Sequence, residues 1–180
     1  MNRVVAGASA RRWVAFLAVA AVVVVADQAA KTYVVANHPL GQPAQVLGDL
    51  VRIWYIHNAG ALFGLFQQSA LIFGLVSLLV IGVIVWLHAR TSASGGWLVT
   101  VGLGLLLGGA VGNAIDRFRY GYVVDFVDLG IGGWRFFTFN IADACIDIGI
   151  LIVIVVALLP SVGARFGGET PTPAGGDEPR

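Results

Sequence analysis

Residues 70–87, with the sequence ALIFGLVSLLVIGVIVWL, form an apolar run that contains no charged side chain. About 20 such residues in a helix cross the roughly 30 Å hydrocarbon core of a bilayer. The whole chain is similarly apolar, because 58% of its 180 residues are hydrophobic and only 12% are charged. A soluble domain needs more polar surface than this to cover its core. The run therefore predicts a membrane-spanning helix in a membrane protein.

Three further runs are long and apolar enough to cross a bilayer. Lipid cannot satisfy backbone polar groups, so each run is expected to be helical. The fold class predicted is an all-α membrane protein, with one domain over residues 1–165 and transmembrane helices at about 13–36, 70–87, 97–115 and 141–159. The Gly- and Pro-rich segment 166–180 has no apolar periodicity and is predicted to be a disordered cytoplasmic tail.

The first span has an alternative interpretation. Arg3, Arg11 and Arg12 before an apolar stretch are also typical of a signal peptide, and the segment AVA at 18–20 resembles a cleavage site. The apolar stretch continues well beyond that segment without a polar break, which favours a retained span.

The third span carries glycine at every fourth position, namely Gly104, Gly108 and Gly112. This spacing places the glycines on one helix face, where a neighbouring backbone can approach closely. We assign them to helix packing and not to chemistry.

Four spans put both termini on one side of the membrane, together with the short loop between the second and third spans. Arg11 and Arg12 lie beside the first span on that side. By the positive-inside rule this side is predicted to be cytoplasmic.

The composition also limits the chemistry available. The net charge is +1, and no basic cluster with interleaved aromatic residues indicates nucleic-acid binding. The three histidines, His38, His57 and His88, are scattered, and no CxxC or HExxH motif occurs, so neither a metal nor another cofactor is predicted. The single cysteine, Cys145, lies in an apolar run and is expected to be a small packing residue.

Most of the aspartates are predicted to lie at a similar depth in the membrane. With antiparallel spans, six of them fall near the membrane edge opposite the termini. Ionisable groups in or beside a bilayer are costly, so a cluster at one depth indicates a functional site. The six are Asp27, Asp116, Asp125, Asp128, Asp143 and Asp147.

Spacing predicts part of the geometry of this cluster. Asn113 and Asp116 are three residues apart and share a helix face. Asn140 can cap the fourth span, which places Asp143 in the first turn, where the helix dipole favours a carboxylate. Two carboxylates over one water can hydrolyse an amide, because like charges at close range separate into an ionised base and a protonated acid. Spacing alone would favour Asp116 over Asp125 as a member of such a pair, since Asp116 has the clearer helical partner.

Five sequence blocks resemble the lipoprotein signal peptidase family, also called signal peptidase II. They occur in the order of the family and cover about 120 residues of the chain. A single NxxD would mean little, whereas five ordered blocks in a four-span chain are highly specific. The blocks are Asp27-Gln28-x-x-Lys31, Asn58-x-Gly60-Ala61-x-Phe63, Gly109-Ala110-x-Gly112-Asn113-x-x-Asp116-Arg117, Val123-Val124-Asp125-Phe126 and Phe139-Asn140-x-Ala142-Asp143.

The resemblance implies an aspartic endopeptidase of the bacterial inner (cytoplasmic) membrane, with both termini in the cytoplasm. Such an enzyme removes the signal peptide from prolipoproteins, cutting before a cysteine that already carries diacylglycerol. The expected partners are this lipidated substrate and membrane lipid, and the protein is expected to be a monomer. Residues 46–56, between the first two spans, resemble a small extracytoplasmic β-sheet that contacts substrate in the family.

By the same resemblance the catalytic pair is Asp125 and Asp143, with Asp116 as a support that pairs with Arg117 or Arg119. Asp128 is expected to be a solvated loop residue, and Asp147 either supports the site or faces a polar gap. The support and substrate-binding positions are Asp27, Lys31, Asn58, Gly60, Asn113, Asp116, Arg117, Asn140 and Ala142. Candidate anchors at the membrane interface are Trp54, Tyr55, Phe63, Phe66 and Trp134.

Two other classes of function fit the sequence less well than a peptidase does. A small ion transporter would carry its charges near the midplane and often shows inverted repeats, whereas these charges lie at an edge and no repeat is found. A non-catalytic scaffold would need no arrangement of paired asparagines and aspartates. The peptidase is therefore the favoured prediction.

Overall fold

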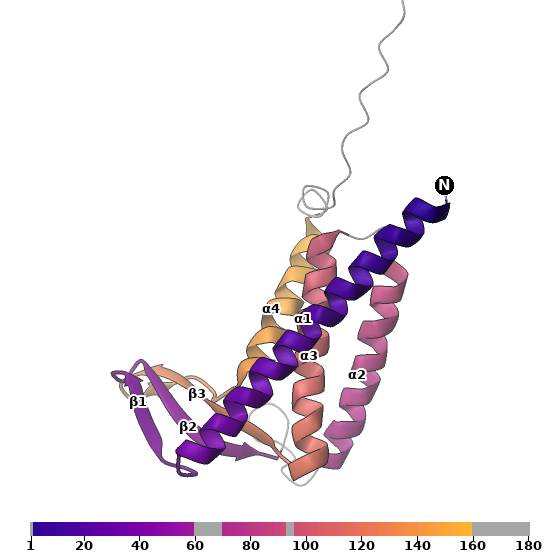
Figure 1. Cartoon of the computed structure of the whole chain (residues 1–180). Coiled ribbons are helices and arrows are strands. Elements are labelled where there is room, and N and C mark those ends of the chain that lie inside the picture. The colour runs from indigo at the N-terminus through magenta and orange to yellow at the C-terminus, as the bar shows by residue number, and fades with distance from the viewer. Residues whose placement is uncertain (1, 60–69, 93–95, 160–180) are drawn as a thin grey trace, which may run out of the picture.

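The computed structural model describes residues 2–59, 70–92 and 96–159. Its described part contains four helices long and apolar enough to cross a membrane, as predicted. Figure 1 shows these helices, which are α1 (Asn2–Asn37), α2 (Ala70–Thr91), α3 (Trp97–Tyr120) and α4 (Ile141–Leu158). The predicted tail at 166–180 and the motif residue Gly60 lie outside the described residues.

Helix α3 lies at the centre of the bundle. Within the protein 61% of its span is buried, against 22% for α1, 17% for α2 and 11% for α4. Its glycines allow this position, because a Cβ built on Gly108 would lie 2.6 Å from the Cβ of Val23 in α1. Gly104 likewise faces Val19 of α1, and Gly109 faces Ala142 of α4. The glycine repeat is thus a packing surface, as predicted.

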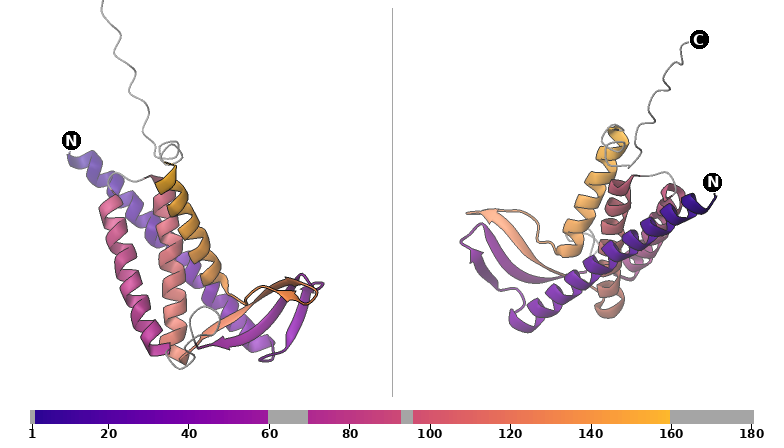
Figure 2. Two further views of the ribbon diagram at one scale, coloured as in Figure 1. Left: turned by 180° about the vertical axis from the view of Figure 1, so that it is seen from behind. Right: turned by 45° about the horizontal axis from the view of Figure 1, so that its top comes forward.

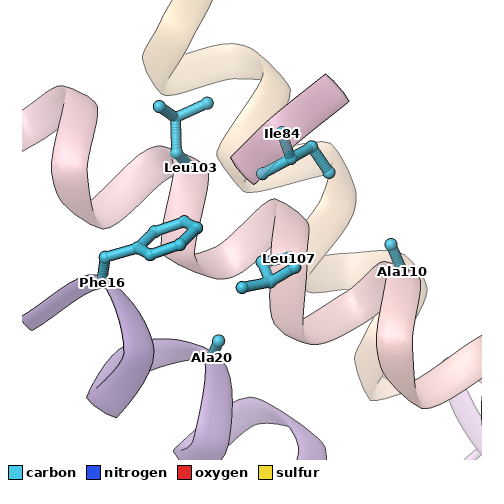
Figure 3. Packing of buried hydrophobic residues seen from close by; sticks show 6 residues of the cluster. All are labelled: Phe16, Ala20, Ile84, Leu103, Leu107 and Ala110. Atoms are coloured by element: carbon cyan, nitrogen blue, oxygen red, sulfur yellow. The ribbon is translucent and has the colours of Figure 1, made fainter. Parts of the chain in front are cut away.

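The apolar core of the bundle joins α1, α2 and α3. Figure 3 shows its buried side chains, which include two alanines beside larger apolar residues. His88 of α2 is also buried, and its ring stacks on that of Phe16 with centroids 4.0 Å apart. The buried residues of this core are Phe16, Ala20, Ile84, Leu103, Leu107 and Ala110.

A small antiparallel sheet lies at the opposite end of the bundle from the N-terminus (Figures 1 and 2). Its strand order is β1-β2-β3-β4. A second apolar cluster of Val34, Tyr55, Val124 and Phe126 packs the sheet against α1. The strands are β1 (Pro43–Leu47), β2 (Val51–Asn58), β3 (Val123–Ile131) and β4 (Trp134–Arg135).

The predicted location of the sheet was only half right. The sequence placed it between the first and second spans, but β3 and β4 come from the loop between the third and fourth. The first four residues of β3 are all buried. A strand buried on both faces shows no alternation of polar and apolar residues, so nothing in its pattern distinguishes it from a loop motif.

The packing of α3 on α1 predicts the effect of filling one glycine. In Gly108→Ala the added methyl group would meet Val23 and the carbonyl oxygen of Ala20 at 2.6 and 2.8 Å. Overpacking of this kind costs about 1–3 kcal/mol, so the thermal unfolding midpoint in detergent should fall. In the matched control Gly82→Ala the new Cβ meets nothing within 4 Å, so the midpoint should stay the same or rise. Equal midpoints for Gly108→Ala and wild type would contradict this account of the repeat.

Candidate active site

The structure brings Asp125 and Asp143 together from different parts of the fold. Asp125 lies in β3 and is buried, while Asp143 lies in the first turn of α4. Asn140 links them, because its Nδ2 donates to Asp125 Oδ1 at 2.7 Å and its Oδ1 accepts from the backbone N–H of Asp143 at 3.0 Å. Asn140 is thus a buried neighbour that both aspartates share.

Two further asparagines complete the polar surroundings of the pair. Asn58 Nδ2 donates to Asp125 Oδ2 at 2.8 Å, so both oxygens of that carboxylate are hydrogen-bonded. Asn113 Nδ2 donates to Asp143 Oδ1 at 2.7 Å. Asn113 Oδ1 in turn accepts from Asn140 Nδ2 at 3.2 Å. The asparagines therefore form a connected network that satisfies buried groups which would otherwise destabilise the fold.

The start of α4 is a capping box, as the spacing predicts. Asn140 accepts from the backbone N–H of Asp143, and Asp143 Oδ2 accepts from the backbone N–H of Asn140 at 3.2 Å. This reciprocal pair fixes the rotamer of Asp143, and the helix N-terminus favours negative charge at that position.

Behind the pair lies a buried ionic cluster formed by Asp27, Lys31 and Asp116. Lys31 is only 4% exposed, and its Nζ lies 2.8 Å from a carboxylate oxygen of each aspartate. The same Nζ donates to Asn113 Oδ1 at 3.1 Å, which joins the cluster to the asparagine network.

Each aspartate of this cluster also holds the backbone next to one member of the pair. Asp116 Oδ2 accepts from the N–H of Val124, the residue before Asp125, at 3.1 Å. Asp27 Oδ1 accepts from the N–H of Ala142, the residue before Asp143, at 3.0 Å. The cluster thus ties β3 and α4 to the same lysine.

Burial raises the pKa of Asp125 to about 7, and the negative charge of Asp143 adds to the rise. Hydrogen bonds from Asn58 and Asn140 act in the opposite direction, because they stabilise the ionised form. A carboxyl group with a pKa in this range can hold or release a proton near neutral pH, which general acid–base chemistry requires.

Two predictions about the acidic cluster were wrong. Asp116 does not pair with Arg117 or Arg119, and in the described part of the chain its ionic partner is Lys31. Asp128 is not solvated but fully buried in β3, where Arg52 Nη2 and Arg135 Nη2 lie 2.6 and 2.7 Å from its Oδ2. Burial alone would raise its pKa, but hydrogen bonds from the two arginines hold the pKa of Asp128 below its ordinary value.

The remaining predicted residues lie at the edges of the site. Arg117 donates from Nη1 to the carbonyl oxygen of Asn113 at 3.4 Å. Asp147 is exposed on α4, and no hydrogen bond or ion pair joins it to the described residues. Gln28 belongs to the first motif, and its sequence context alone predicts no role for it. Its Nε2 donates to Asp116 Oδ1 at 2.9 Å, and its position beside Asp27 was the available signal.

Fold and site together define a class of protein: a multi-span membrane protein with paired carboxylates beside one end of its helix bundle. Comparison with known sequences then identifies the family. A sequence profile described as Signal peptidase (SPase) II matches residues 19–159. The chain belongs to this family, and the resemblance drawn from its motifs is confirmed. It is accordingly a multi-pass bacterial membrane protein and a signal peptidase of lipoproteins.

Relatives of known name cover most of the chain. A lipoprotein signal peptidase of Lactobacillus gasseri is 35% identical over 148 residues, which is 82% of this chain and 94% of that protein. One of Moorella thermoacetica is 39% identical, covering 81% of this chain and 94% of that protein. One of a Methylobacterium species is 42% identical, covering 77% and 86%.

Two solved structures share the fold. One, described as a bacterial membrane enzyme studied by the in meso method at 2.3 Å resolution, superposes with a TM-score of 0.73 and 29% identity. The alignment covers 86% of this chain and 93% of that one. A second, described in the same words at 1.9 Å, has a TM-score of 0.71 and 31% identity over 80% and 92% of the two chains.

The buried cluster predicts a large effect of removing its lysine. In Lys31→Met, Asp27 and Asp116 lose the cation that they share. Breaking a buried ion pair from one side costs about 3–5 kcal/mol, so the thermal unfolding midpoint should fall sharply. The control Arg11→Met removes an exposed cation of the same helix and should change stability by less than about 0.5 kcal/mol. If both variants unfold at the wild-type temperature, the cluster does not hold the site.

Proposed function

We propose that this chain is an aspartic endopeptidase that removes the signal peptide from diacylglyceryl-modified prolipoproteins, cutting before the lipidated cysteine. The observation that carries the proposal is the convergence of Asp125 and Asp143 on Asn140. Membership of the signal peptidase II family supports the substrate class. The partner is the lipidated prolipoprotein within membrane lipid, and the enzyme acts as a monomer.

In the proposed reaction the pair shares one proton and acts on one water. Asp143, held by Asn113 and the capping box, takes a proton from the water as its oxygen attacks the scissile carbonyl carbon. Asp125 gives its proton to the carbonyl oxygen, which yields a neutral tetrahedral diol. As the C–N bond breaks, Asp143 passes its proton to the leaving nitrogen and Asp125 recovers one from the diol. Both carboxyl groups then return to their starting states.

We place the sheet end of the bundle on the extracytoplasmic side, with both termini in the cytoplasm. The two termini of the helix bundle lie at the end opposite the sheet (Figure 1), and Arg11 and Arg12 lie near that end. A lipidated cysteine keeps its acyl chains in the bilayer, so its peptide bond stays near the membrane surface. Carboxylates at the end of the spans meet that bond without drawing the lipid into water.

Removing either carboxylate tests the proposed pair. Purified Asp125→Asn and Asp143→Asn should cleave a lipidated prolipoprotein more slowly by a factor of about 10²–10⁴, the usual contribution of a positioned acid or base. Asp147→Asn is the matched control, since it changes an exposed aspartate one turn along the same helix, and it should keep wild-type activity. Wild-type rates in both pair variants would exclude the mechanism, and loss of activity with EDTA would indicate a metal instead.

The raised pKa of Asp125 predicts the alkaline limb of the activity profile. Asp125 must carry a proton to donate, and with a pKa of about 7 it loses that proton as the pH rises through 7. The value of kcat/KM should therefore fall above about pH 7. In Asn58→Ala one hydrogen bond to the ionised form is lost, so the pKa rises and the limb should move to higher pH.

The matched control for this shift is Asn37→Ala, because Asn37 is exposed and its side chain bonds only within α1 in the described structure. Its alkaline limb should match that of the wild type. A limb in Asn58→Ala that stays in place or moves to lower pH would show that Asp125 is not the group that titrates.

A further inference from the structure

The free end of the sheet carries a cluster of exposed apolar side chains. Trp134 is 88% exposed and Ile131 is 77% exposed, so the rest of the protein covers little of either residue. Isolated exposed apolar residues are ordinary, but a contiguous apolar patch marks a surface that meets something else. We call the following residues the tip patch: Leu47, Leu50, Ile131, Trp134 and Phe136.

The tip patch is one surface, although it comes from two hairpins. The β1–β2 hairpin supplies the two leucines, and the β3–β4 hairpin supplies the other three residues. The backbone N–H of Gly130 donates to the carbonyl oxygen of Leu50 at 3.0 Å, so the hairpins are hydrogen-bonded close to their ends.

Buried Asp128 reinforces this junction. It binds Arg52 of the first hairpin and Arg135 of the second through its Oδ2, at 2.6 and 2.7 Å. Both hairpins are therefore held in a fixed relation, and the apolar side chains cannot turn away from the surface by an independent movement of either loop. The exposure of the patch is a consequence of the folded sheet itself.

The position of the patch relative to the spans identifies what can cover it. In Figures 1 and 2 the sheet projects sideways from the bundle, and its free end lies level with the beginning of α4. The candidate membrane span of α4 begins there, at Ile141. Apolar side chains of α4, among them Ile148 and Leu151, are exposed as well, as expected of a span that faces lipid.

We propose that the tip patch inserts into the leaflet at the sheet end of the bundle and anchors the sheet to the bilayer. Tryptophan suits this depth, because its ring is apolar and its indole N–H can bond to headgroups. Arg52 and Arg135, each about one fifth exposed, lie one residue further from the hairpin ends than Val51 and Trp134. Long arginine side chains reach the headgroup layer while their stems stay apolar.

The test measures depth directly and does not depend on catalysis. The full chain, in a Cys145→Ala background, carries a spin label at Ile131→Cys or at Gln42→Cys. Gln42 is exposed at the opposite end of the first hairpin, next to α1, and serves as the matched control. Each protein is reconstituted at one copy per nanodisc in phosphatidylethanolamine and phosphatidylglycerol. The collision rate of the spin label with oxygen, which is enriched in the bilayer, is then compared with its collision rate with a water-soluble nickel chelate.

The ratio of oxygen to nickel accessibility should be several-fold higher at position 131 than at position 42. Adding Trp134→Glu to the labelled protein should move the label at 131 toward water, with the helix content unchanged. A label at 131 as accessible to nickel as the control overturns the proposal, as does an unchanged ratio in the Trp134→Glu protein. A high ratio that requires two copies per disc also overturns it, because a second copy and not lipid would then cover the patch.

Discussion

Lys31 is the side chain on which the geometry of the site depends. A single buried ammonium group lies between the carboxylates of Asp27 and Asp116 and compensates both. The desolvation free energy of two buried carboxylates would be too high without this cation, and so would that of a buried lysine without the carboxylates. The three charges therefore form one unit, and the backbone N–H groups that the two aspartates accept lie directly before Asp143 and Asp125. The cluster that balances these buried charges therefore also positions the proposed catalytic pair.

The asparagines supply hydrogen bonds to the carboxylates without adding charge. A carboxylate in an apolar setting needs hydrogen-bond donors, but a cation in direct contact would hold it permanently ionised. Amide groups donate without adding charge, so Asn58 and Asn140 can satisfy Asp125 while its pKa stays raised to about 7. Asn113 is the junction between the two systems, because it accepts from Lys31 and donates to Asp143. A neutral side chain therefore links the lysine to Asp143 by hydrogen bonds.

The sequence predicted what is local or carried by a motif. Long apolar runs predicted the four spans, glycine spacing predicted the packing face of α3, and Asn140 with Asp143 predicted the capping box. Contacts between segments that are distant in the chain were not predicted. The partner of Asp116 is Lys31, which lies 85 positions earlier in the chain, while two arginines stand nearby on its own helix. Asp128 was misjudged for the same reason, because the two arginines that compensate its burial come from two different strands.

The choice of Asp125 over Asp116 as the partner of Asp143 also depends on the tertiary structure. In the sequence, only the resemblance to a family motif indicates that choice. Asp116 belongs to the bundle, whereas Asp125 belongs to the sheet, so a pair made of Asp125 and Asp143 exists only when sheet and bundle are docked. Two contacts dock the sheet on the bundle. One is polar, the hydrogen bond from the N–H of Val124 to Asp116, and the other is apolar, the cluster that contains Val34 and Phe126. A sheet that leaned away from α1 would carry Asp125 with it and break its bond to Asn140. Any constraint on the sheet is therefore a constraint on the distance between the two carboxylates.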